Sequence, residues 1–76
     1  MKNVYVVKDH VYETMEVYST YEAACKEAKE WAEYIKKHRN LGEINQEVLD
    51  DETRWYEENK VLEPVVVVYT RKLLTN

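Results

Sequence analysis

Carboxylates are the side chains of this 76-residue chain whose types and spacing could do chemistry. They gather between Glu43 and Glu63, where eight acidic residues accompany two basic ones, whereas Met1 to Gly42 carries seven of each. Two carboxylates can act as an acid and base pair only when different environments separate their pKa values. Adjacent acids in a polar stretch share one solvated environment, so this pattern indicates a binding surface for a positively charged partner.

Other reactive side chains are few and far apart. Cys25, the only cysteine, falls within a predicted helix, where a cysteine usually acts as a small hydrophobe. Neither His10, in a predicted turn, nor His38, about three turns further along that helix, can serve as its base. The sequence lacks metal-ligand spacing, and its single glycine cannot build a phosphate-binding loop. We therefore expect no enzyme activity, no catalytic residue, no metal and no cofactor.

Aromatic side chains supply the second part of the predicted surface. The chain has seven Tyr and two Trp, which are types that dominate interface energetics because they bury a large area and keep a polar group. Acidic and aromatic side chains occur together between Asp50 and Glu58, which predicts a docking surface in this stretch. The predicted partner-binding residues are Asp50, Asp51, Glu52, Trp55, Tyr56, Glu57 and Glu58.

A hairpin and a helix are predicted to form the first half of the chain. Asn3–Lys8 and Val11–Tyr18 are rich in β-branched and aromatic residues, with a turn at Asp9-His10 or a longer loop through Tyr12 or Glu13. Ser19 and Glu22 fit a capping box, which predicts a helix start. The apolar stripe of this helix is predicted to be Tyr21, Ala24, Ala28, Trp31 and Ile35, and its C-cap Gly42.

The second half is predicted to add strands to the same sheet. Val65–Thr70, after Pro64, is apolar on both faces, which is typical of a central strand. Thr53–Glu57 is predicted to pair with it, although a short helix from Asp50 or Asp51 is the alternative. Ile44–Leu49 is expected to form one or two helical turns. The predicted fold is α+β, with one long helix on one face of an antiparallel sheet of three to four strands, in ββαββ order, as one domain over residues 1–76.

The strand-to-helix junction resembles that of small proteins encoded by bacteriophages and prophages. The shared features are an opening strand of the Val-Tyr-Val-Val type, here Val4–Val7, and a helix that begins Ser-x-x-Glu-Ala, here Ser19–Ala23. The resemblance covers roughly half of the chain. It implies a protein that is often non-enzymatic and that commonly binds and inhibits a host enzyme or defence component. It carries over no functional residue.

These observations lead to one expected function and two alternatives. We expect a non-enzymatic protein-binding module whose acidic surface meets a basic surface of its partner. The resemblance implies the inhibitor kind, with a host nucleic-acid enzyme or defence component as that partner. We also expect a homodimer, because so small a domain usually needs a partner subunit. A structural homodimer and a nucleic-acid-binding protein are the alternatives, the latter opposed by the net charge of -4. The longest apolar run is too short to span a membrane, so we expect no membrane contact and a cytoplasmic location, that of the host if phage-encoded.

Overall fold

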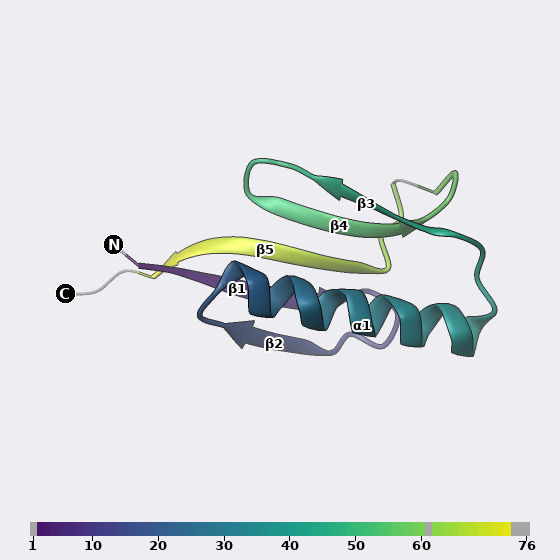
Figure 1. Ribbon diagram of the computed structural model, residues 1–76, viewed down its shortest axis with the longest axis horizontal. Helices are drawn as coiled ribbons and strands as arrows, with labels where there is room; N and C mark the ends of the chain where they lie inside the picture. The colour runs from purple at the N-terminus through teal and green to yellow at the C-terminus, as the bar shows by residue number, and fades with distance from the viewer. Residues whose placement is uncertain (1, 61, 74–76) are drawn as a thin grey trace.

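One helix packs on a five-stranded antiparallel sheet (Figure 1). The structure is a computed structural model that describes residues 2–60 and 62–73. Its elements are β1 (Lys2–Asp9), β2 (Met15–Tyr18), α1 (Tyr21–Arg39), β3 (Ile44–Val48), β4 (Glu52–Glu57) and β5 (Val66–Leu73). The strands lie in the order β2-β1-β5-β4-β3, and every neighbouring pair is antiparallel. The predicted α+β class is confirmed.

The predicted strand number and order differ from the structure because Ile44–Val48 forms a strand rather than helical turns. β3 pairs with β4 across a tight turn, where the Leu49 N–H donates to the Glu52 carbonyl at 2.8 Å. A one- or two-turn helix gains few hydrogen bonds for the residues it orders, whereas this hairpin pairs each residue of β3. The order is therefore ββαβββ, and β4 replaces the alternative helix at Asp50 or Asp51.

The first hairpin has a longer loop than the two-residue turn at Asp9-His10. The Asp9 carboxylate accepts the N–H groups of Val11, Tyr12 and Thr14, and this side chain is only 4% exposed. Three backbone donors that no ladder satisfies are thus paired by one buried acid. β2 consequently begins at Met15 rather than Val11, and the longer-loop alternative is confirmed.

Both ends of α1 differ by a residue or two from the prediction. The N-cap is Thr20 rather than Ser19, because the Thr20 hydroxyl accepts the Ala23 N–H at 3.2 Å. The C-cap is Asn40 rather than Gly42, with a left-handed φ of 55°. Asparagine tolerates this conformation better than most residues, so the helix does not need to reach the glycine.

The core lies between α1 and the sheet. Small side chains at Ala24, Ala28 and Ala32 let the helix lie close to the strands, and Ile35 continues the same buried stripe. Val7, Val66 and Val68 are 0% exposed, and each such side chain contributes about 1.5–3 kcal/mol by leaving water. Of the predicted stripe, Tyr21 and Trp31 are half-buried at its margins.

The opposite side of the sheet, which we call the open face, carries no helix. Side chains alternate along each strand, so Val66 and Val68 of β5 point toward α1 while Val67 and Tyr69 point away. The cross-strand register extends this assignment to every strand. The open face includes Val4, Val6, Lys8, Met15, Val17, Glu52, Arg54, Tyr56, Val67, Tyr69 and Arg71.

Candidate functional site

The predicted acidic surface is divided between the two ends of β4. Asp50 and Asp51 form the turn before this strand, whereas Glu57 and Glu58 lie where it ends. A strand rises about 3.3 Å per residue, so roughly 20 Å separates the two groups. The carboxylates therefore do not form one continuous patch.

Two of these carboxylates have partners within the chain. Glu52 lies 3.2 Å from the Arg54 guanidinium. Glu57 lies 3.3 Å from the Lys60 ammonium and accepts the Gly42 N–H at 2.8 Å. The Gly42 hydrogen bond and then Lys60 lower the pKa of Glu57 below its ordinary value. Both acids are thus already engaged in local structure.

The two predicted aromatic anchors lie on opposite sides of the sheet. Trp55 is 5% exposed and packs in the core under α1. Tyr56 is half-buried on the open face. A buried Trp55 cannot reach a partner without unfolding. Asp50, Asp51 and Glu58 are exposed, whereas Tyr56, Glu52 and Glu57 keep part of their surface in solvent. Partner binding through the seven predicted residues stays a prediction.

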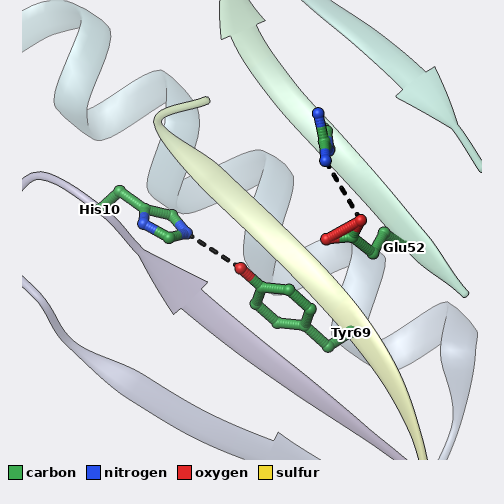
Figure 2. A network of polar contacts seen from close by, with 4 residues as sticks. His10, Glu52 and Tyr69 are labelled. Carbon is green, nitrogen blue, oxygen red and sulfur yellow. Dashed lines mark hydrogen bonds and ion pairs between the residues drawn. The ribbon is translucent and has the colours of Figure 1, made fainter. Parts of the chain in front are cut away.

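Side chains at the centre of the open face contact one another (Figure 2). The His10 ring lies 3.3 Å from the Tyr69 hydroxyl, and the Arg71 guanidinium lies 4.8 Å from the centre of the Tyr69 ring. Next to them Glu52 points toward Arg54. Val67 between these groups is only 1% exposed. Val67 and the face of the Tyr69 ring that Arg71 covers are therefore not free to meet a partner.

Exposed apolar side chains lie instead on the two edge strands, at Val48 of β3, which is 64% exposed, and at two residues of β2. Met15 is 60% exposed and Val17 is 59% exposed, and both belong to the open face. β2 is an edge strand, so no described strand pairs with its outer side. Exposed apolar side chains on an unpaired strand form a template for another strand.

The hydrogen-bond pattern shows which backbone groups of β2 face outward. The Asp9 N–H donates to the Thr14 carbonyl at 2.9 Å, so these two residues form a hydrogen-bonded pair. Bonded and non-bonded pairs alternate along an antiparallel ladder. Glu16 is therefore the next residue bonded to β1, while Met15 and Val17 turn their N–H and C=O groups away from it. We call the outward backbone groups and side chains of Met15 and Val17 the β2 edge.

A cavity of about 390 Å³ lies beside the start of β2, between α1 and the loop that follows β1. Its aromatic walls are Tyr12, Trp31 and Tyr34. Glu30 adds a carboxylate, and the buried Asp9 holds the loop that closes one side. Apolar walls with one or two charged groups are typical of a recognition pocket.

Acidic side chains surround β2 on the side of the sheet that faces α1. Glu16 belongs to β2, and Glu27 and Glu30 belong to α1. Partial burial raises the pKa of the Tyr18 hydroxyl, and the negative charges of these three acids raise it further. Within the described residues, none of the three lies within ion-pair distance of a basic group. Their charge is therefore available to a partner at this edge.

Cys25, His10 and His38 are not arranged for catalysis. Burial raises the pKa of the half-buried Cys25 thiol, which keeps it protonated at neutral pH. The His38 ring stacks on Tyr34, with ring centres 4.1 Å apart, and His10 contacts Tyr69. Among residues 2–60 and 62–73, no group of three His, Cys, Asp or Glu side chains is placed to hold a metal ion.

Sequence reasoning missed the β2 edge although its signal was present. Met15 and Val17 alternate with Glu16, which is the pattern of a strand with one apolar face. Whether that face meets the helix depends on which side of the sheet α1 covers. The two-residue alternation of side chains looks the same in the sequence for either side, so it cannot decide this. The structure places this apolar face on the side away from α1.

Comparisons with known proteins leave the function open. No family model, curated protein or solved structure matches this chain. In the described part of the chain, no helix combines the length and apolar character that crossing a membrane requires.

Proposed function

We propose that this chain is a non-enzymatic protein-binding module that receives a strand of its partner at the β2 edge. The observation that carries the proposal is the combination of outward backbone groups with the exposed side chains of Met15 and Val17. An extended segment added to a sheet edge gains main-chain hydrogen bonds, and the alternating side chains of the edge supply specificity.

The role implied by the bacteriophage resemblance fits this proposal. An inhibitor acts by occupying a segment of a host enzyme or defence component, in the host cytoplasm, and needs no reactive group for that purpose. The exposed carboxylates of Asp50, Asp51 and Glu58 would speed the approach of a basic partner, because long-range charge acts mainly on the association rate.

A substitution in the β2 edge tests the proposal. Val17→Pro removes an N–H that faces away from β1, so the β1–β2 hydrogen bonds are kept. The matched control is Val48→Pro, which removes the corresponding outward N–H on the other edge strand, β3. Circular dichroism and thermal unfolding should first show that both variants are folded.

Tagged wild-type protein and both variants would then be used to capture proteins from nuclease-treated native cell extract. We expect a protein that wild type and Val48→Pro capture equally and that Val17→Pro loses, because only β2 pairs with it. Capture that is equal for all three proteins would contradict binding at the β2 edge. A parallel capture from untreated extract completes the test, and a protein captured only from the untreated extract would favour the nucleic-acid alternative.

A further inference from the structure

The two sides of a strand added to β2 would meet different chemistry. On the open face, such a strand lies beside Met15 and Val17, which are both apolar. On the α1 side, it lies beside Glu16, with Glu27 and Glu30 of the helix close by. Since side chains alternate across a sheet, the residues of the added strand must alternate as well.

The α1 side also offers a place for a long cationic side chain. The 390 Å³ cavity beside β2 combines the rings of Trp31 and Tyr34 with the Glu30 carboxylate. A lysine or arginine can lay its stem on such rings and bring its charge to the carboxylate. The chain already contains one example, because the Arg39 guanidinium lies 5.3 Å from the centre of the Tyr12 ring.

A second copy of this chain does not suit the β2 edge. Two β2 strands paired about a two-fold axis would bring the acidic sides of both copies together, including Glu16, Glu27 and Glu30. The other edge strand, β3, offers Asn45, Gln46 and Glu47 in its centre, and none of them is basic. A nucleic-acid backbone is repelled by the same acids.

We propose, on the basis of the protein-binding function above, that the β2 edge takes an extended partner segment in which apolar and basic residues alternate. The apolar residues lie beside Met15 and Val17 on the open face, and the basic residues point toward Glu16 and Glu30. The partner is therefore a protein with a cationic, strand-forming segment, which satisfies the outward backbone groups and the unpaired carboxylates together.

Synthetic hexapeptides provide the probes for this proposal. The first alternates Lys and Val, the second alternates Glu and Val, and the third has the composition of the first with its lysines and valines in two blocks. Binding would be followed by nuclear magnetic resonance on ¹⁵N-labelled full-length protein. We expect the alternating Lys-Val peptide to shift the amide signals of Met15 and Val17, and the other two peptides to bind far more weakly.

Charge-neutral variants test the predicted orientation of the peptide. In Glu16→Gln/Glu30→Gln, the dissociation constant for the alternating Lys-Val peptide should rise roughly fivefold, because two ion pairs are lost. The matched control, Glu43→Gln/Glu63→Gln, removes the same charge from two exposed acids outside α1 and β2 and should leave the constant unchanged. Equal weakening in both double variants would mean that only net charge matters and would overturn the proposed orientation.

Two further outcomes would overturn the proposal. One is equal or tighter binding of the Glu-Val peptide, and the other is the absence of any shift at Met15 and Val17 with the Lys-Val peptide. If Val17→Pro still abolishes capture of a protein in either case, the protein-binding function stands and only the partner chemistry is wrong. If capture is also unaffected by Val17→Pro, both proposals fail.

Discussion

The backbone N–H of Gly42 donates to the Glu57 carboxylate at 2.8 Å, and this bond ties the segment after α1 to the end of β4. Lys60 approaches the same carboxylate at 3.3 Å. Glu57, one of the residues predicted for docking, thus also joins two segments of the fold. Loss of the negative charge of Glu57 should therefore lower the stability of the folded state.

Glu57→Gln should lower the urea midpoint of unfolding at neutral pH. The Gly42 hydrogen bond and Lys60 hold the folded-state pKa of Glu57 below the ordinary value of 4.5. A lowered pKa stabilises the folded state above the ordinary value, and this contribution is lost as the pH falls through the folded-state pKa. The midpoints of wild type and variant should therefore converge as the pH falls below 4.5 and through the folded-state pKa. Glu58→Gln serves as the control, and a gap that persists unchanged at low pH would contradict this account.

Trp55→Ala should destabilise the protein by about 3–5 kcal/mol, because it opens a cavity in the core under α1. Tyr56→Ala should destabilise the protein less, because the Tyr56 side chain is only half-buried on the open face. Urea titrations followed by circular dichroism give both values. A Trp55→Ala variant with wild-type stability would show that this ring is a surface anchor after all.

Thr20→Ala should lower the free energy of unfolding by about 1 kcal/mol, because the first turn of α1 loses the hydroxyl that accepts the Ala23 N–H. Ser19→Ala, one residue earlier, should change it by less than about 0.5 kcal/mol. The same urea titration measures both. The reverse order of effects would restore Ser19 as the cap.

Cys25 should react slowly with alkylating agents. Burial raises the pKa of its thiol, and only the thiolate is the nucleophile. Near about pH 8, the rate with iodoacetamide should be at least roughly tenfold below that of free cysteine, and unfolding in urea should restore it. Folded protein that reacts faster than free cysteine would reopen the possibility of an activated nucleophile.

Much of the fold could be predicted because local patterns and tertiary packing agree. The helix from Tyr21 follows from its alanine stripe and cap, and the valine run before Tyr69 forms the central strand that its composition predicts. β3 was missed because Ile44–Val48 has a weak pattern of its own and gains its hydrogen bonds from β4.

The candidate site was harder to predict than the fold. Charge along the sequence places Glu52 and Glu57 in one acidic stretch, but it does not show that Arg54 and Lys60 neutralise them. Glu16 belongs to a different element from Glu27 and Glu30 and comes close to them only when α1 lies beside β2. Distances between elements, rather than composition, decide which acids act together.

Amide hydrogen exchange of the partner-bound protein tests the central claim most directly. Strand addition at the β2 edge should slow exchange at the Val17 and Met15 amides roughly a hundredfold on binding, while Val48 on the other edge strand exchanges as before. Unchanged exchange at Val17, or protection that appears at Val48 instead, would contradict binding at β2.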